Sequence, residues 1–216
     1  MLLYYITDRK QLDADELRQR SRLLEKIAEA ARCGVDYVQL REKDLPAKQL
    51  ELLAREAVDA IQKYSPRNSQ LRTKLLINSR IDVALACAAG GVHLPAGEVS
   101  PRTVREIYSR SAGHGKIAPV ISVACHDPDE VKQAAQENAD LVLFAPVFGK
   151  RGYSSTPAGL DALQKACRQN IPVLALGGVT LENSGACMQA GAAGIAAIRL
   201  FQENSMEETV RMLRRL

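Results

Sequence analysis

The run Gln39-Leu40-Arg41-Glu42-Lys43 places an amide and two cations directly after a short apolar segment. In an extended chain alternate side chains share one side, so Gln39, Arg41 and Lys43 are expected to face the same way. An arginine there offers a planar fork that matches a carboxylate or a phosphate. The run therefore predicts a substrate-binding group for an acidic, planar ligand, although by itself it also fits a solvated cluster of charges.

Three more polar residues stand where apolar runs end: Asn78, His93 and His126. Histidine has an ordinary pKa of about 6.5, which suits proton transfer in both directions near neutrality. We predict that His126 is a general acid/base and that Asn78 and His93 bind substrate. A single histidine more commonly satisfies a core hydrogen bond, and this alternative stays open for His93. His114 lies in a glycine-flanked stretch and is predicted to be incidental.

Paired glycines, Gly177 and Gly178, follow the apolar run Val173–Leu176, and a threonine typical of a helix start comes soon after. Glycines let backbone N–H groups turn outward and approach a ligand closely, and a helix N-terminus adds a positive dipole end. Together with the backbone at Ala197 and Ile198, this stretch predicts a main-chain phosphate site. The alternative is a plain strand-to-helix turn.

The elements that must position these residues are indicated by apolar runs that alternate with amphipathic segments. Eight runs predict buried strands, at Leu2–Thr7, Tyr37–Leu40, Lys74–Asn78, Gly91–Leu94, Ile117–Val123, Leu141–Ala145, Val173–Leu176 and Gly194–Ile198. Helices are predicted at Glu16–Cys33, Pro46–Lys63, a short segment ending at Ala88, Pro101–Arg110, Pro128–Asn138, Pro157–Arg168, Thr180–Ala190 and Met206–Leu216. The inward stripe of the first helix is predicted to contain Leu17, Leu24, Ile27, Ala28 and Ala31.

Eight strand–helix units without a break in composition favour a (β/α)8 TIM barrel, with residues 1–216 as a single domain. A doubly wound sheet usually has fewer strands and an early glycine fingerprint, whereas the first run here ends in Ile6-Thr7-Asp8. Chemistry in such a barrel collects where the strands end. The polar residues described above stand at those positions.

Bulk properties narrow the class of protein. The 216 residues are 46% hydrophobic and 25% charged, with a net charge of +4, which is too mild to predict a nucleic-acid partner. No apolar run reaches the length that spans a membrane, and the N-terminal residues lack the features of a signal peptide. Five cysteines without paired spacing favour reduced thiols in a cytoplasmic protein. Cys125, beside His126, is the one candidate for reactivity.

The chain resembles the thiamin phosphate synthase/TenI family along nearly its whole length. The motifs that carry the resemblance are Tyr5-Ile6-Thr7-Asp8, Val38–Asp44, Ile77-Asn78, Gly91–Leu94, Ala139-Asp140 with Pro146–Phe148, Ala175–Val179 and Gly191–Ala196. The resemblance implies a (β/α)8 barrel, a role in thiamin biosynthesis, a small phosphorylated thiazole substrate and assembly into homodimers or higher oligomers.

Two chemistries occur in this family. The synthase couples a hydroxymethylpyrimidine pyrophosphate to a thiazole phosphate, and Mg²⁺ neutralises the departing pyrophosphate. Its pattern carries one aspartate where this chain has Ser79 and another near Glu98, so one carboxylate is missing and Glu98 is the remaining candidate Mg²⁺ ligand. The loop at 149–156 has cations but lacks the synthase pattern for pyrophosphate. That loop and the one at 65–73 are long enough to be lids.

The TenI branch matches more closely, in Leu94–Pro101 and Val142–Phe144. TenI is similar to a thiazole tautomerase, which moves a proton from a ring carbon to an exocyclic carbon without a metal, and the resemblance places its catalytic histidine at His126. We therefore expect a cofactor-free isomerase in which Arg41 and Gln39 orient the substrate carboxylate. Two alternatives remain: the Mg²⁺-dependent synthase, and a non-catalytic protein that binds thiazole phosphate.

Overall fold

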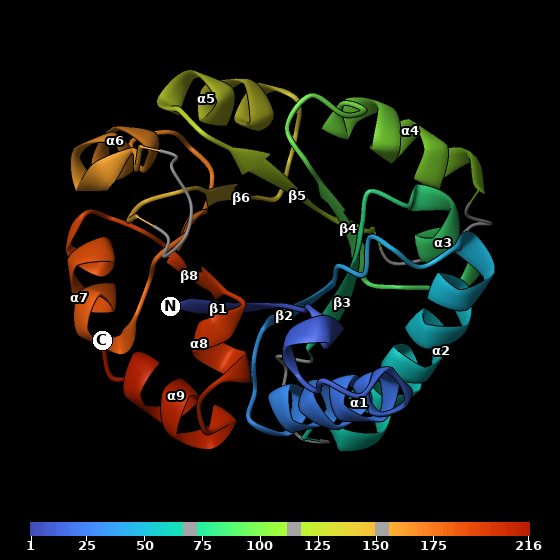
Figure 1. The fold of residues 1–216 in the computed structure, drawn as a ribbon. Coiled ribbons are helices and arrows are strands. Elements are labelled where there is room, and N and C mark those ends of the chain that lie inside the picture. Colours follow the sequence, from blue (N-terminus) through green and yellow to red (C-terminus); the bar gives the residue numbers. More distant parts are fainter. Residues whose placement is uncertain (67–72, 112–117, 150–155) are drawn as a thin grey trace.

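The computed structural model describes residues 1–66, 73–111, 118–149 and 156–216. Eight parallel strands close into one barrel in sequence order, with β1 hydrogen-bonded to both β2 and β8. The helices surround this barrel (Figure 1). The predicted (β/α)8 architecture is therefore confirmed. The loop segments 67–72 and 150–155, which belong to the two candidate lids, lie outside the described residues, as does His114.

The strands are β1 (Leu2–Ile6), β2 (Tyr37–Leu40), β3 (Lys74–Asn78), β4 (Gly91–Leu94), β5 (Val120–Cys125), β6 (Leu141–Phe144), β7 (Val173–Leu176) and β8 (Gly194–Ala197). The bounds of β2, β3, β4 and β7 equal the predicted ones. The prediction for β5 was wrong, because this strand begins after Pro119 and extends to Cys125. Proline has no N–H to donate to a strand ladder, which explains the later start.

The helices in the described part of the chain are η1 (Arg9–Gln11), α1 (Glu16–Arg32), α2 (Ala47–Tyr64), α3 (Ile81–Ala86), α4 (Pro101–Ser111), α5 (Pro128–Gln136), α6 (Gly159–Ala166), α7 (Leu181–Gln189), α8 (Arg199–Gln202) and α9 (Met206–Leu213). The sequence did not predict η1 and α8, which are too short to show a helical period. None of these helices is long and apolar enough to cross a membrane.

The predicted inward stripe of α1 was wrong at Leu17, which is 90% exposed. The buried face instead runs through Gln19, Leu23 and Ile27. Two residues correspond to about 200° around a helix, so a stripe that passes through Gln19 places Leu17 on the solvent side. The glutamine was overlooked because a polar side chain does not count toward an apolar period.

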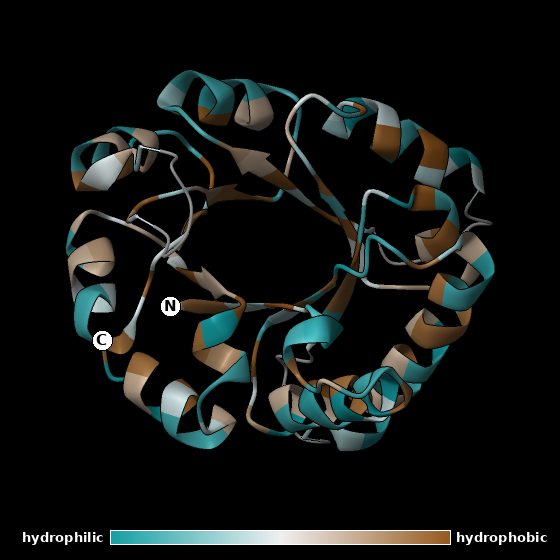
Figure 2. Cartoon of the chain, viewed as in Figure 1, coloured by the Kyte–Doolittle hydropathy of each residue, from teal (hydrophilic) through white to brown (hydrophobic). Residues whose placement is uncertain are grey.

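Alternation along the strands separates two apolar layers. Outward side chains pack against the helices, and the inward ones fill the barrel with Tyr4, Ile6, Leu76, Val120, Leu141, Leu143, Leu174 and Ala196. Figure 2 shows hydrophobic colouring on the strands and on helix faces that turn toward them. Because the interior is filled by side chains, a ligand is expected at an end of the barrel.

Candidate active site at the carboxyl end of the barrel

The predicted polar residues of β2, β3 and β4 lie together where these strands end. Gln39 Nε2 donates to Asn78 Oδ1 at 2.8 Å, and Asn78 stands opposite His93 in the register of β3 and β4. Gln39 is 1% exposed. These three residues, which the sequence placed at the ends of predicted strands, therefore share one corner of the barrel, and their roles toward a substrate stay predictions.

A chain of hydrogen bonds fixes the orientation of the Gln39 amide. Asn78 Nδ2 donates to Ser79 Oγ at 2.9 Å, and Ser79 Oγ donates to Glu98 Oε1 at 3.0 Å. A carboxylate can only accept, so Ser79 must donate its proton, and each earlier group in the chain must also donate. Gln39 Oε1 is left buried without a partner among the described residues. Such a carbonyl is suited to accept from a ligand, because an unmet buried acceptor is costly.

His93 belongs to a second buried chain. Its Nδ1 lies 2.8 Å from Ser122 Oγ, which lies 3.0 Å from the Tyr4 hydroxyl. Burial, with the nearby cations Arg41 and Lys43, lowers the pKa of His93 to about 3. His93 is therefore neutral at physiological pH. Sequence reasoning missed Tyr4 and Ser122, although a hydroxyl inside an otherwise apolar strand was a usable signal for Ser122.

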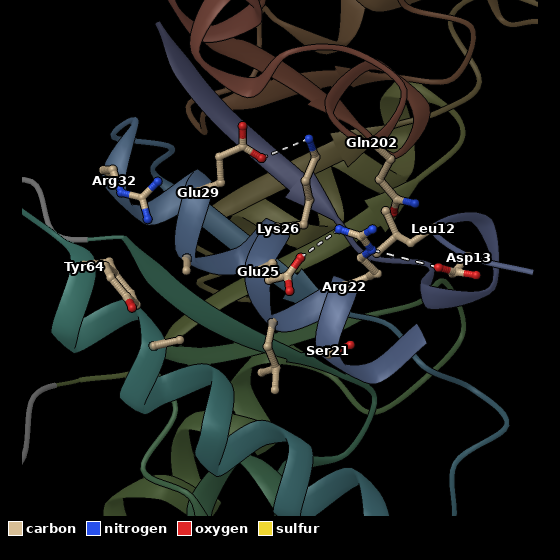
Figure 3. Close-up of a pocket in the computed structure, with 13 residues that line it drawn as sticks. Leu12, Asp13, Ser21, Arg22, Glu25, Lys26, Glu29, Arg32, Tyr64 and Gln202 are labelled. Carbon is tan, nitrogen blue, oxygen red and sulfur yellow. Dashed lines mark hydrogen bonds and ion pairs between the residues drawn. The ribbon is translucent and has the colours of Figure 1, made fainter. Parts of the chain in front are cut away.

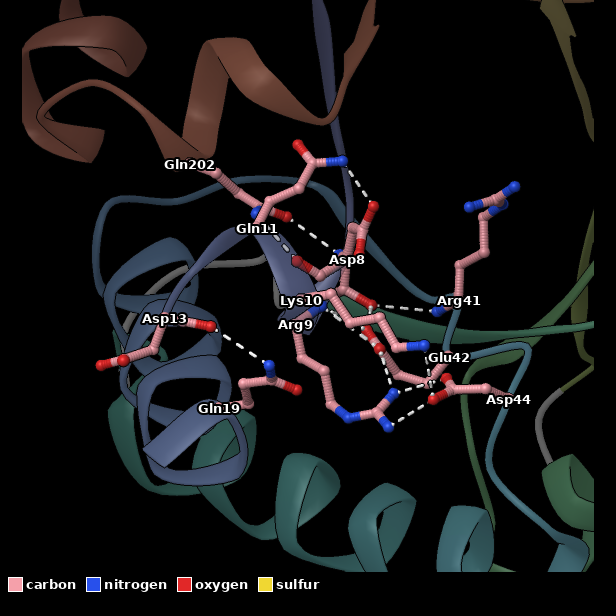
Figure 4. A network of polar contacts seen from close by, with 11 residues as sticks. Asp8, Arg9, Lys10, Gln11, Asp13, Gln19, Arg41, Glu42, Asp44 and Gln202 are labelled. Carbon is pink, nitrogen blue, oxygen red and sulfur yellow. Dashed lines mark hydrogen bonds and ion pairs between the residues drawn. The ribbon is translucent and has the colours of Figure 1, made fainter. Parts of the chain in front are cut away.

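The charged run after β2 contains the buried Glu42, the half-buried Arg41 and the exposed Lys43, and neither cation has an ion-pair partner among the described residues. Glu42 accepts from Thr7 Oγ1 at 2.6 Å and pairs with Arg9 at 2.9 Å, and Arg9 also pairs with Asp44 at 2.7 Å (Figure 4). Burial raises the pKa of Glu42, and the hydrogen bonds from Thr7 and Arg9 oppose that shift. The alternative of a solvated charge cluster is therefore wrong for Glu42. In Figure 4 the Arg41 guanidinium points away from this cluster.

The glycine pair ends β7 and leads into α7. Gly177 and Gly178 have φ values of +93° and +66°, a conformation that side-chain-bearing residues rarely adopt. Asn183 Nδ2 donates to the Gly178 carbonyl at 3.0 Å, and its Oδ1 accepts from the Thr180 N–H at 2.8 Å. Within the described part of the chain, no acceptor contacts the backbone N–H groups of Gly178 or Ile198. These N–H groups are free to bind an anion.

The end of β8 is tied to the end of β1. Ala197 is the last residue of β8, and Ile198 precedes α8. Gln202 in α8 accepts from the Asp8 N–H at 2.9 Å and donates to the Asp8 carbonyl at 3.0 Å. Because β7 and β8 are neighbours, the structure brings together the predicted phosphate-binding residues Gly177, Gly178, Ala197 and Ile198.

His126 follows β5 on the exposed side of the barrel end. Its backbone N–H donates to Glu130 Oε2 at 2.6 Å, and its Nδ1 lies 2.6 Å from the Ala145 carbonyl oxygen. Because that carbonyl can only accept, Nδ1 carries a proton, and Nε2 has no hydrogen-bond partner among the described residues. The neighbouring Cys125 is buried, which raises the pKa of its thiol to about 12 and leaves it unreactive at neutral pH.

Comparison with known proteins assigns the chain to a family. The family model described as thiamine monophosphate synthase matches residues 3–201. The chain belongs to the thiamine monophosphate synthase family. A relative from Aquifex aeolicus, 36% identical over 93% of this chain and 97% of its own length, is named a second thiamine-phosphate synthase, an assignment that its name marks as provisional. A Roseiflexus castenholzii protein named thiamine-phosphate synthase is 31% identical over 91% of this chain and 79% of its own length.

A solved structure confirms the fold of this family member. The thiamine phosphate pyrophosphorylase from Pyrococcus furiosus superposes with a TM-score of 0.78 over 99% of this chain and 94% of that one, at 24% identity. The comparisons confirm the family but do not separate its two branches. The relatives named above carry the name of the synthase, and the tautomerase that the sequence motifs led us to expect has no support from them.

A family member that acts as a synthase must accommodate Mg²⁺. Ser79 Oγ and Glu98 Oε1 are in contact at 3.0 Å, and the resemblance puts one synthase aspartate at Ser79 and the other near Glu98. Among the described residues no group of three or more His, Cys, Asp or Glu side chains could hold a metal ion. Mg²⁺ usually takes one or two carboxylates and draws its other ligands from water and substrate phosphates. Glu98, with the Ser79 hydroxyl beside it, would supply one carboxylate, which is the smaller of these two numbers.

A surface groove of about 830 Å³ runs along α1 and α2 (Figure 3), and of the barrel-end residues described above its lining includes Gln202. Its charged lining is largely paired within itself: Lys26 contacts Glu29 at 3.0 Å and Arg22 contacts Glu25 at 3.2 Å. The Arg22–Glu25 pair is exposed and the Lys26–Glu29 pair is half-buried, so these four charged groups of the lining already have partners within the groove. We therefore place the candidate site at the barrel end rather than in this groove.

Proposed function

We propose that this chain is a thiamine-phosphate synthase, a transferase that joins an aminopyrimidine pyrophosphate to a thiazole phosphate. The observation that carries the proposal is Gln39 Oε1, a buried acceptor that the hydrogen-bond chain from Glu98 keeps free. The exocyclic amine of the pyrimidine is a donor that suits it. The thiazole phosphate carboxylate on which a tautomerase acts has no N–H group to offer. The names of the relatives support the same reaction.

The charges at the barrel end suit a pyrophosphate. Arg41 and Lys43 are close enough to His93 to affect its pKa, and both are cations. Glu98, with the Ser79 hydroxyl beside it, would hold Mg²⁺. Bound there, Mg²⁺ would supply positive charge that stabilises the departing pyrophosphate. Cations and a single carboxylate at one rim are the combination that a Mg²⁺–pyrophosphate substrate requires.

The second substrate would bind on the opposite strands. Backbone N–H groups at Gly178 and Ile198 are suited to hold the thiazole phosphate. The C–O bond to pyrophosphate breaks, pyrophosphate leaves with the bonding electron pair, and the thiazole nitrogen donates its lone pair to the same carbon. No proton is gained or lost at the reacting atoms. The contribution of the protein is to hold both partners in line, which replaces a bimolecular encounter.

The direct test supplies both substrates with Mg²⁺ and measures thiamine phosphate and pyrophosphate. Gln39→Leu, which removes the acceptor at similar size, should raise KM for the pyrimidine substrate about tenfold or more and leave KM for the thiazole phosphate nearly unchanged. Gln19→Leu is the matched control, because Gln19 is buried on the remote helix α1. Absence of product from the wild-type protein with Mg²⁺ present would reject the proposal.

Thiazole tautomerisation is the second candidate function. It is favoured by Nε2 of His126, which has no partner among the described residues, and by the hydroxyl of Ser79 in place of a carboxylate. The test supplies the non-aromatic thiazole phosphate carboxylate and follows the appearance of aromatic absorbance. Turnover in this assay alone would favour the isomerase, and saturable binding without turnover in either assay would favour a thiazole phosphate-binding protein.

A further inference from the structure

Tyr4, Ser122 and His93 form a buried polar chain inside an otherwise apolar barrel. They come from β1, β5 and β4, and their exposed fractions are 0%, 0% and 5%. The Tyr4 hydroxyl lies 3.0 Å from Ser122 Oγ, which lies 2.8 Å from His93 Nδ1. The rings of Tyr4 and His93 also meet edge to face, with centroids 6.5 Å apart. The proposed reaction gives no role to Tyr4 or Ser122.

The number of protons that need an acceptor fixes the direction of the hydrogen bonds from Tyr4 through Ser122 to His93. The fully buried Tyr4 hydroxyl has Ser122 as its hydrogen-bond partner among the described residues, so Tyr4 donates to Ser122. Ser122 must then donate its own proton, and its acceptor among the described residues is His93 Nδ1. If Nδ1 carried a proton instead, one of the two hydroxyl protons would be buried without an acceptor. Such a group costs about 1 to 3 kcal/mol, so the first arrangement is favoured.

We infer that Tyr4 and Ser122 are positioning residues that hold His93 in the tautomer with its proton on Nε2, which makes His93 a fixed, neutral hydrogen-bond donor to the substrate. The part that concerns the substrate rests on the proposed function. A donor at this position favours a ligand with an acceptor atom facing His93 Nε2 and disfavours a ligand with a donor there. The tautomer itself is a property of the ligand-free protein and can be measured without any assay of activity.

The surroundings of His93 agree with a donor that does not change its charge. His93 is buried, and the cations Arg41 and Lys43 disfavour its protonation. The other groups in contact with it, Tyr4 and Ser122, are uncharged hydroxyls. Asn78, its register neighbour on β3, is also uncharged. No described carboxylate contacts the ring to stabilise an imidazolium.

The first test is ¹⁵N NMR of the full-length protein labelled at histidine. The chain has three histidines, and the resonances lost in His93→Gln identify those of His93. We expect Nε2 to show the shift of a protonated ring nitrogen and Nδ1 that of a bare one, at neutral pH and without substrate. A proton on Nδ1, or an imidazolium, would overturn the inference whatever reaction the protein catalyses.

The second test compares Tyr4→Phe with Tyr37→Phe. The Tyr37 ring lies 5.7 Å from that of Tyr4, but its hydroxyl is not part of the chain, so it is the matched control. Tyr4→Phe should increase the population with the proton on Nδ1 and lower kcat/KM for coupling about tenfold, and Tyr37→Phe should change neither. A wild-type tautomer in Tyr4→Phe would overturn the inference. Absence of coupling in the wild type would reject the proposed function and leave the NMR result valid.

A pair of variants at His93 covers the case in which Tyr4→Phe does not fold. The amide nitrogen of glutamine occupies the place of Nε2, whereas that of asparagine occupies the place of Nδ1. His93→Gln should therefore retain more coupling activity than His93→Asn, by about tenfold. Equal activity, or the reverse order, would contradict a donor at Nε2.

Discussion

Nδ1 of His126 lies 2.6 Å from the carbonyl oxygen of Ala145, a contact that leaves Nε2 as the basic nitrogen of the ring. His93 has the opposite arrangement, because a hydroxyl donates to its Nδ1 and the proton remains on Nε2. The two histidines at this end of the barrel are therefore suited to different chemical roles. His126 is able to take a proton, and His93 is able to donate a hydrogen bond without transferring its proton.

The His126 contact predicts which reaction each histidine affects. Any thiazole tautomerisation by this protein should fall by roughly 10² to 10⁴ in His126→Ala, the range for loss of a general acid/base. Coupling of the pyrimidine and thiazole substrates should change much less, because that step moves no proton at the reacting atoms. Both rates are measured on one preparation, with His114→Ala as the control for loss of a histidine. Equal loss in the two reactions would contradict the assignment.

Ser79 predicts a gain of metal affinity. Its φ of +61° is a conformation that aspartate tolerates better than most residues, so Ser79→Asp should fit the existing backbone. The new carboxylate would stand beside Glu98 and complete a two-carboxylate site. We expect the Mg²⁺ concentration that gives half-maximal coupling to fall by about tenfold. Ser79→Asn, equal in shape but uncharged, is the control, and an equal effect of both variants would argue against a metal site there.

Much of the fold could be read from the sequence because the barrel strands are short, apolar and bounded by polar residues. For example, the strand predicted from Val173 to Leu176 has the same limits as the observed β7. The failures have local causes: Leu17 belongs to an apolar spacing that the true face of α1 does not use. The four residues of α8 are too few to show a period, yet Gln202 within that helix ties the end of β8 to β1.

The sequence predicted where the residues of the candidate site lie better than it predicted the hydrogen bonds between them. The positions of Gln39, Asn78 and His93 follow from strand ends, which any barrel brings together. That a carboxylate on Glu98 orients the Gln39 amide through two intervening residues depends on loop geometry. The charge pattern alone also did not predict that Glu42 is buried, because burial beside Arg9 depends on how the loops after β1 and β2 meet.

The neutral state of His93 predicts how stability responds to acid. The ordinary pKa of histidine is about 6.5, and burial lowers that of His93 to about 3 in the folded protein. Between these values the unfolded chain binds a proton that the folded chain does not, so the free energy of unfolding falls as pH decreases from about 6.5 toward 3. The slope from this residue is at most about 1.4 kcal/mol per pH unit.

Urea unfolding of the wild type and His93→Gln across this range measures that slope. The variant should lose stability less steeply below pH 6.5, because it removes the group that the unfolded chain protonates. Above pH 7 the two profiles should run parallel, since the histidine is then neutral in both states. Parallel profiles over the whole range would contradict the assignment of a buried, neutral His93.

Gly178 predicts a coupled loss of phosphate affinity and stability. Its φ is +66°, and a Cβ at this position would lie 2.7 Å from the Gly149 carbonyl oxygen and 2.8 Å from Phe148 Cβ. Gly178→Ala should therefore destabilise the fold by about 1 to 3 kcal/mol. It should also weaken thiazole phosphate binding, because the backbone N–H of residue 178 would be displaced. Gly185→Ala is the matched control, because the nearest described atom outside its own helix turn would be Leu216 Cδ2, 3.9 Å from the added Cβ. Within α7 this alanine should stabilise the protein by up to about 1 kcal/mol and leave the affinity unchanged. Calorimetric titration with thiazole phosphate and thermal unfolding measure both effects, and wild-type affinity in Gly178→Ala would remove the glycine pair from the phosphate site.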